Sequence, residues 1–201
     1  PSTYNNYLNN LTSSTPTEKV KVNAKALYPH DIVMSILRGQ EAVAQAQWDA
    51  LPNFCDDTNI LPMIDVSGSM GFLGSSSLSP IHIATSLGMY LAEKNSSDFK
   101  DLFLTFSNQP KLQLLKGNLK SRLQQLARAD WGMNTDLNKA FNLVLDVAVN
   151  NKVSQKDMPE IILILSDMEF DRNEPDTTAF KMIKDKYKAA GYEVPNIVFW
   201  N

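Results

Sequence analysis

Apolar and polar residues follow two rhythms along this chain, one typical of strands and one typical of helices. Short continuous apolar runs predict buried strands, and these runs lie at 62–66, 102–106, 111–115, 161–166 and 196–200. Between the runs, apolar positions recur at helical spacing, which predicts amphipathic helices at 31–51, 80–94, 119–129, 137–149 and 179–190. The chain therefore alternates strands with helices over most of its length.

This alternation predicts an α/β fold of the Rossmann-like type, with a mostly parallel central sheet flanked by helices on both faces. The connection at 107–110 departs from that plan. It alone separates the predicted strands at 102–106 and 111–115, whereas a parallel connection needs a crossover of about a dozen residues or more. We therefore expect 111–115 to be an antiparallel edge strand.

Several predicted helices begin at residues with capping side chains. Ser79 followed by Pro80 matches the preferred N-cap and first helical position. Asp136 is placed to cap the helix that begins at residue 137, and Asp31 is placed to cap the first helix. Gly39 interrupts the apolar spacing of that first helix.

The N-terminal part differs in composition from the rest. Residues 1–20 are rich in Asn, Ser, Thr and Pro, and we expect a loose arm there. The segment 20–55 either packs beside the sheet or is the tail of a larger helical domain. We divide the chain into an N-terminal arm and helical extension, residues 1–55, and a sheet domain, residues 56–201. Because the first residue is Pro rather than Met, we expect a piece of a longer protein.

Composition and charge narrow the class of protein. Of the 201 residues, 43% are hydrophobic, and 19 Lys and Arg face 22 Asp and Glu, which gives a net charge of −3. Broad nucleic-acid binding is disfavoured, because it needs a basic surface. The single cysteine, Cys55, excludes an internal disulfide, and the longest apolar run, 161–165, is too short to span a bilayer. We expect a cytoplasmic or otherwise intracellular protein with no membrane contact.

The densest patch of Ser and Gly in the chain directly follows the first predicted strand. It begins with Asp65, Ser67 and Ser69 at alternate positions. In open α/β sheets, ligands bind at the carboxyl ends of the strands, so this patch lies where a ligand is expected. Two further oxygen-bearing residues are expected at the same edge: Thr135, in the loop before a helix, and Asp167, directly after a strand.

The patch does not match motifs for phosphate binding or phosphoryl transfer. A Walker loop needs G-x-x-x-x-G-K-[ST], but Gly68 and Gly74 are one residue too far apart and a serine stands in place of the lysine. The dinucleotide fingerprint G-x-G-x-x-G is absent. A phosphotransferase of the aspartyl-phosphate type would want a second aspartate two residues after Asp65, where the chain has Ser67.

Nucleophilic catalysis is disfavoured as well. A G-x-S-x-G elbow around Ser69 lacks its first glycine, and its base would have to be His30 or His82. Surface or packing roles are typical of histidines in or next to helices, as both of these are. Cys55 has neither a second cysteine nor a near histidine, so we expect a thiol without a role. We therefore expect that the protein is not an enzyme.

A divalent-metal site fits the same residues. Mg²⁺ and Mn²⁺ take oxygen ligands in octahedral geometry, with few protein carboxylates and several waters. The D-x-S-x-S spacing lets Asp65, Ser67 and Ser69 present one carboxylate and two hydroxyls to one side of a loop. Thr135 would add a hydroxyl and Asp167 a carboxylate, directly or through water. Without these two distant residues, the short motif alone would indicate a capped turn.

The sequence DVSGSM at 65–70 resembles the metal-ion-dependent adhesion site (MIDAS) of von Willebrand factor A (vWA) domains. Thr135 in GMNTDL matches the loop threonine of that family, and Asp167 in LSDMEF matches its later aspartate. More narrowly, DVSGSM, NTDL, SDMEF and the closing FWN resemble intracellular vWA-like domains of a poorly characterised family from plants and viruses, and more distantly the vWA domain of the Ro autoantigen. The resemblance covers about 59–201.

The resemblance implies a vWA fold whose metal, Mg²⁺ or Mn²⁺, is held by Asp65, Ser67, Ser69, Thr135 and Asp167. Because a full vWA domain usually has six strands, the last helix and edge strand are expected beyond this chain. The implied function is a divalent-cation-dependent protein-binding module, whose metal is completed by an acidic residue of a protein partner.

Two alternatives stay open. The first is a scaffold part of a Ro-like ribonucleoprotein, in which RNA contacts lie outside this chain and RNA is bound only indirectly. The second is a metal-dependent hydrolase of phosphate esters. Two-metal hydrolysis usually brings several carboxylates to hold the ions, and the strand ends supply too few of them.

Overall fold

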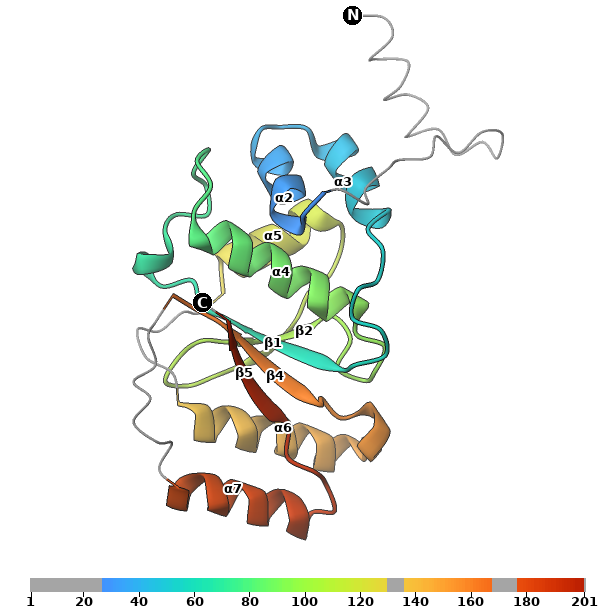
Figure 1. Cartoon of the computed structure of the whole chain (residues 1–201), viewed down its shortest axis with the longest axis vertical. Helices are drawn as coiled ribbons and strands as arrows, with labels where there is room; N and C mark the ends of the chain where they lie inside the picture. Colours follow the sequence, from blue (N-terminus) through green and yellow to red (C-terminus); the bar gives the residue numbers. More distant parts are fainter. Residues whose placement is uncertain (1–26, 130–135, 168–176, 201) are drawn as a thin grey trace, which may run out of the picture.

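A computed structural model describes residues 27–129, 136–167 and 177–200. Figure 1 shows a five-stranded sheet with helices on both of its faces. The strands are β1 (Ile60–Ile64), β2 (Leu102–Thr105), β3 (Leu112–Leu114), β4 (Ile161–Leu165) and β5 (Asn196–Trp200). The helices are α2 (Pro29–Leu37), α3 (Glu41–Asp49), α4 (Pro80–Lys94), α5 (Leu119–Ala127), α6 (Leu137–Asn151) and α7 (Thr177–Ala189), with short 3-10 turns η1 (Gly68–Met70) and η2 (Gln155–Asp157).

The strand order in the sheet is β3-β2-β1-β4-β5. Every neighbouring pair is parallel except β2 with β3, which is antiparallel. Leu104 of β2 pairs with Met63 of β1 on one side and with Leu112 of β3 on the other. The predicted α/β class is thereby confirmed, including the mostly parallel sheet and its antiparallel edge strand.

The helices α2, α3, α4 and α5 lie over one face of the sheet (Figure 1). Their buried apolar side chains form one cluster with the strands, and its members include Ile32, Trp48, Met89 and Phe103. The helix α4 approaches β1 closely because residue 88 is glycine: a Cβ there would lie 2.4 Å from Cδ1 of Ile64. This contact places α4 directly against the strand that leads into the Ser and Gly patch.

The helices α6 and α7 lie over the opposite face (Figure 1). Phe141 and Tyr187 pack edge to face with ring centroids 6.2 Å apart, and the Tyr187 hydroxyl donates to the Phe141 carbonyl at 2.8 Å. Side chains of β1 alternate between the faces: Leu61 and Met63 pack on this side, and Ile64 packs on the α4 side. A sheet covered on both faces explains why its strands are continuous apolar runs.

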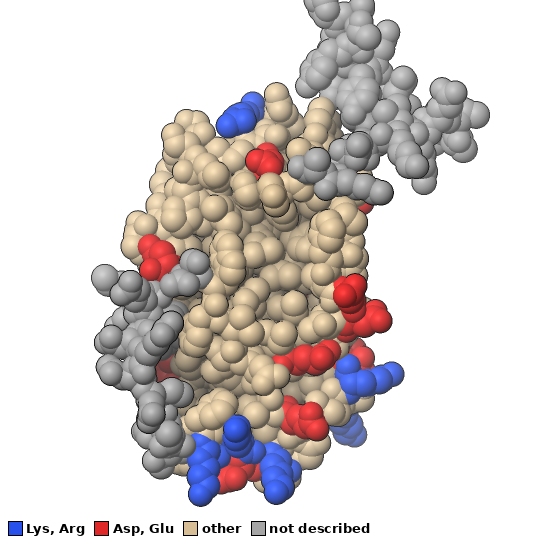
Figure 2. Space-filling view, viewed as in Figure 1, with Lys and Arg blue, Asp and Glu red and all other residues tan. Residues whose placement is uncertain are grey.

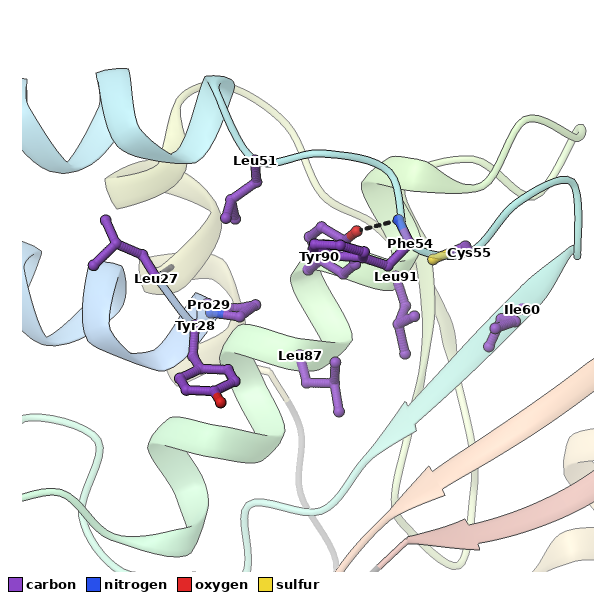
Figure 3. Close-up of a pocket in the computed structure, with 10 residues that line it drawn as sticks. All are labelled: Leu27, Tyr28, Pro29, Leu51, Phe54, Cys55, Ile60, Leu87, Tyr90 and Leu91. Carbon is purple, nitrogen blue, oxygen red and sulfur yellow. Dashed lines mark hydrogen bonds between the residues drawn. The ribbon is translucent and has the colours of Figure 1, made fainter. Parts of the chain in front are cut away.

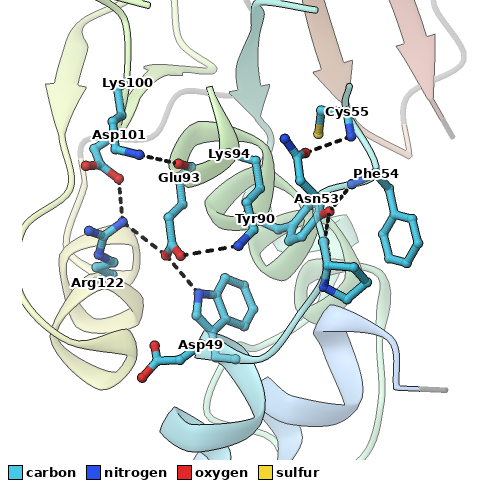
Figure 4. Close-up of polar contacts among 12 residues, drawn as sticks. Asp49, Asn53, Phe54, Cys55, Tyr90, Glu93, Lys94, Lys100, Asp101 and Arg122 are labelled. Carbon is cyan, nitrogen blue, oxygen red and sulfur yellow. Dashed lines mark hydrogen bonds and ion pairs between the residues drawn. The ribbon is translucent and has the colours of Figure 1, made fainter. Parts of the chain in front are cut away.

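The helix α3 is joined to the sheet domain by a polar network as well as by apolar packing (Figure 4), and α2 is joined to it by apolar packing. The Trp48 indole N–H of α3 donates to Glu93 Oε2 of α4 at 2.8 Å. Arg122 Nη1 of α5 reaches the same carboxylate at 3.4 Å and Asp101 Oδ1 at 2.6 Å. Residues 27–55 therefore pack beside the sheet, while the domain boundary at 55/56 stays a prediction.

The expected helix caps are confirmed at two helices and wrong at one. Ser79 and Pro80 open α4, and the Asp136 side chain accepts a hydrogen bond from the Lys139 N–H at the start of α6. Asp31 does not cap α2, which begins at Pro29, because proline is well suited to the first helical position. The Asp31 carboxylate lies in the first turn and accepts from the Tyr28 N–H at 3.1 Å.

Charged side chains are unevenly spread over the face shown in Figure 2. They gather at the α7 end, while the middle of this face carries few of them. The lysines of α7, such as Lys181, Lys184 and Lys188, are exposed. Among the helices described, none combines the length and the apolar character needed to cross a bilayer.

Candidate metal centre

The carboxyl ends of β1 and β4 lie side by side because these strands are parallel neighbours. Their pairing extends past the last strand residue, since the Asp65 N–H donates to the Leu165 carbonyl at 2.9 Å. Asp65 follows β1 and is fully buried, and Ser166 follows β4 and is almost fully buried. The fold therefore places the first predicted ligand at the expected edge of the sheet.

The Asp65 carboxylate is held by two hydrogen bonds. Its Oδ1 accepts from the Ser67 N–H at 2.7 Å, and its Oδ2 accepts from the Ser166 hydroxyl at 2.5 Å. A carboxylate can accept about four hydrogen bonds, so these two fix its orientation and leave acceptor capacity for a further ligand. In the described part of the chain, no Lys, Arg or His side chain forms an ion pair with it.

The hydroxyls and the second carboxylate lie just beyond Asp65. The chain turns through η1, which leaves the Ser67 and Ser69 hydroxyl oxygens 3.1 Å apart. The Ser69 hydroxyl donates to Asp167 Oδ1 at 3.0 Å, and the Asp167 N–H contacts the sulfur of Met70 at 3.2 Å. The loops that follow β1 and β4 are thus joined side chain to side chain.

The spacing of these oxygens fits an octahedral ion. With metal–oxygen bonds of about 2.1 Å, neighbouring ligands of Mg²⁺ lie about 3 Å apart, and the two oxygen–oxygen distances here are 3.1 and 3.0 Å. Ser69 and Asp167 are exposed, so an ion held there would keep water ligands. Among the described residues, no three His, Cys, Asp or Glu side chains are grouped so that they could hold a metal ion, which is the set that a zinc or two-metal centre needs.

The structure brings together four of the residues predicted as ligands, namely Asp65, Ser67, Ser69 and Asp167. Thr135 lies outside the described residues. Ser166, which orients Asp65, had no predicted role. Its position between a buried strand and Asp167 is the sequence signal that could have identified it.

Away from the candidate metal loop, an apolar pocket of about 400 Å³ lies between α4, the start of α2 and the segment after α3 (Figure 3). The Tyr90 hydroxyl in its wall accepts from the Phe54 N–H at 2.8 Å and donates to the Pro52 carbonyl at 2.7 Å. Burial raises the pKa of the Cys55 thiol and the pKa of the Tyr90 hydroxyl. Both groups are therefore protonated at neutral pH, and neither is poised as a nucleophile or base.

The known proteins that are similar to this chain include a viral protein and a bacterial one. An uncharacterised protein of Acanthamoeba polyphaga mimivirus, L728, is 31% identical over 207 residues, which cover 98% of this chain and 34% of the viral protein. The crystal structure of the Deinococcus radiodurans Ro (RSR) protein matches with a TM-score of 0.57 at 16% identity, covering 98% of this chain and 41% of that one. The chain thus spans about a third of the viral relative and less than half of the Ro protein.

These similarities agree with the fold and the family resemblance expected from the sequence. The Ro likeness supports the Rossmann-like, vWA-like fold, and at this identity it shows the fold alone. The viral relative agrees with the viral proteins that the motifs resemble. A family model described as "Domain of unknown function (DUF7788)" matches residues 59–201. The chain therefore belongs to the DUF7788 family.

Proposed function

We propose that this chain is a divalent-cation-dependent protein-binding module of the MIDAS type. In this proposal Asp65, Ser67, Ser69, Thr135 and Asp167 hold Mg²⁺ or Mn²⁺. The observation that carries it is the Asp65 carboxylate, which is 0% exposed and has no cationic side-chain partner among the described residues. A buried carboxylate needs hydrogen bonds and positive charge to be stable, and a metal ion beside the two serine hydroxyls would supply the charge.

The charge count of the site favours an acidic partner. Asp65 and Asp167 together offset the charge of one divalent ion at most, and the serine hydroxyls are neutral ligands. The Ser69 and Asp167 side chains are exposed, so the ion would be reachable from outside. A partner carboxylate that replaces a water would therefore gain charge-assisted coordination, and the surrounding surface would set specificity.

We also propose that the module acts without catalysis. The raised pKa of the Cys55 thiol and the small number of carboxylates at the metal loop support this proposal. A second candidate function, a scaffold part of a Ro-like ribonucleoprotein, is favoured by the fold likeness to the Ro protein. The net charge of −3 argues that RNA contacts would then lie outside this chain.

The test is capture of proteins from native lysate on the immobilised chain. We expect partners that bind in Mg²⁺, are released by EDTA and bind again when Mn²⁺ is added. Asp65→Asn and Thr135→Ala should lose them, and neutralising one Asp or Glu of the partner should abolish binding. A partner that binds equally well in EDTA would contradict metal dependence. Capture that disappears after ribonuclease treatment would favour the ribonucleoprotein scaffold instead.

A further inference from the structure

An apolar pocket of about 380 Å³ adjoins the candidate metal loop. Its wall includes Val66, which lies between the predicted ligands Asp65 and Ser67, and Phe72, which follows η1. The far side is formed by the end of α5, including Ala127. The loop that carries the candidate ligands therefore also forms part of the pocket wall.

The size and lining of the pocket indicate what it can accept. Pockets for small-molecule ligands measure about 300–1,000 Å³, so this one is at the small end of that range. Its described lining is apolar apart from Gln124 and the loop backbone, and none of these lining side chains is charged. A large aliphatic or aromatic side chain fits this description, and a nucleotide or another charged ligand does not.

Phe72 is the exposed part of the pocket wall. Phe72 is 75% exposed, so its ring is accessible to a partner. A Cβ at residue 74 would lie 2.7 Å from Cε1 of the Phe72 ring. The ring therefore lies directly against the backbone of Gly74.

A buried histidine fixes the loop that carries Phe72. His82 is fully buried in α4, as expected for a packing residue. The Ser79 N–H can only donate, so His82 Nδ1 accepts that hydrogen bond at 3.1 Å, and Nε2 carries the proton donated to the Leu73 carbonyl at 3.0 Å. Because one side chain bonds to both ends of the segment 73–79, the pocket wall is preformed.

We infer that this pocket receives an apolar side chain of the same protein partner whose carboxylate completes the metal site. The inference rests on the proposed function. The occupant follows from adjacency, because Val66, whose chain neighbours are the predicted ligands Asp65 and Ser67, lines the pocket. The module would therefore recognise a short segment of the partner. This segment carries one acidic residue and, at a fixed distance from it, one large apolar residue. The pocket would thus select among the many exposed carboxylates that a metal alone accepts.

The test uses the full chain and a library of soluble peptides, each with one fixed glutamate and randomised neighbours, selected in Mn²⁺. We expect Leu, Ile, Met or Phe to be enriched at one position relative to the glutamate. Ala127→Phe should fill the pocket from the exposed end of α5 and weaken the selected peptide at least tenfold. Its matched control is Ala189→Phe, at the exposed last residue of α7 on the opposite face of the sheet.

A second pair of variants removes the pocket wall instead of filling the pocket. Phe72→Ser should weaken the same peptide several-fold, and Phe54→Ser, which removes an equally exposed ring from the pocket in Figure 3, should not. All four variants should bind Mn²⁺ with the affinity of the unaltered chain in calorimetry. That readout separates loss of the pocket from damage to the metal site.

The possible outcomes distinguish this inference from the proposed function. Peptides that are selected in a Mn²⁺-dependent way without an apolar preference, or that bind Ala127→Phe unchanged, would overturn the pocket and leave the metal-dependent module standing. Absence of Mn²⁺ binding, absence of any Mn²⁺-dependent peptide, or equal peptide binding in EDTA would overturn both.

Discussion

Both ends of the β-sheet carry small polar side chains, but the side chains at the two ends form different hydrogen bonds. At the amino end, Asn95 Nδ2 donates to the Ile60 carbonyl at 3.1 Å, and Asn95 Oδ1 accepts from the N–H and the hydroxyl of Ser97 at 2.8 and 2.7 Å. Asn95 and Ser97 are both buried. Their hydrogen-bonding groups are used within the chain, so this end of the sheet is a structural cap.

At the carboxyl end, hydroxyls and carboxylates bond to one another and remain partly exposed. The Ser69 hydroxyl joins Ser67 to Asp167, and the Asp65 carboxylate lies buried behind them. A carboxylate can accept about four hydrogen bonds, so the two that Asp65 accepts leave capacity for a further ligand. The carboxyl end thus differs from the amino end in two ways: it carries carboxylates where the amino end has an amide, and these carboxylates retain acceptor capacity.

The acidic residues of the molecule show the same contrast. Glu93 and Asp101 are largely buried and share Arg122 as a cationic partner, as Figure 4 shows. Asp65 is buried more completely and has no such partner among the described residues. In the proposed function, a cation from outside the chain takes the place that Arg122 occupies in the network.

The largest expected effect is that of Asp65→Ala, which should abolish Mn²⁺ binding and also destabilise the metal-free fold. The Ser67 N–H and the Ser166 hydroxyl would both lose their acceptor, and a buried donor left unsatisfied costs about 1–3 kcal/mol. Calorimetry measures the first effect, and chemical denaturation in EDTA measures the second. Retained Mn²⁺ affinity would show that the ion binds elsewhere.

Asn95→Ala should affect stability alone. It leaves the Ile60 carbonyl and the Ser97 donors without their partner, so we expect a loss of about 1–3 kcal/mol in the free energy of unfolding. Mn²⁺ affinity should not change, because this residue lies at the opposite end of the sheet. A drop in metal affinity comparable to that of Asp65→Ala would remove the distinction between the two ends.

Ser69→Ala should do the reverse: it should weaken Mn²⁺ binding and leave stability almost unchanged. Ser69 is exposed, so stability should change by less than about 0.5 kcal/mol. Loss of one neutral ligand should weaken Mn²⁺ binding about tenfold, which corresponds to about 1.4 kcal/mol. Ser76→Ala, at an exposed serine of the same loop, is the matched control and should bind Mn²⁺ normally. Equal affinity in the two variants would remove Ser69 from the ligand set.

The smallest expected effect concerns pH and the cap of α6. The hydrogen bond from the Lys139 N–H holds the pKa of Asp136 below its ordinary value of 3.8. The charged cap therefore stabilises the fold above about pH 4, and this contribution disappears as the pH falls through the lowered folded-state pKa. Asp136→Asn keeps a capping side chain but cannot titrate, so its stability should depend less on pH below 4. If the free energy of unfolding of Asp136→Asn fell below pH 4 as steeply as that of the unaltered chain, this assignment would be contradicted.

The sequence predicted the sheet well, because buried parallel strands leave continuous apolar runs such as Ile161–Leu165. The turn at 107–110 revealed the antiparallel edge for an equally local reason, its length. The start of α2 was misplaced because Asp31 is a good cap by type, while the preceding Pro29 determines where the helix begins.

The candidate site was predicted in part. The spacing of Asp65, Ser67 and Ser69 is local, and the order of strands and helices was enough to expect Asp167 nearby. Contacts between side chains that are distant in sequence left no periodic signal. The Ser166 bond to Asp65 and the pocket between Phe72 and α5 could therefore be seen only in the folded chain.

The most direct test of the account is a Mn²⁺ titration by calorimetry of the unaltered chain and Asp65→Asn. Asparagine keeps an acceptor for the Ser67 N–H and can donate to the Ser166 hydroxyl, so the substitution removes the charge and preserves the hydrogen bonds. We predict that the unaltered chain binds Mn²⁺ and Asp65→Asn does not, while both unfold at similar temperatures in EDTA. Equal Mn²⁺ affinity in the two proteins, or no binding by the unaltered chain, would contradict a metal centre at the carboxyl end of the sheet.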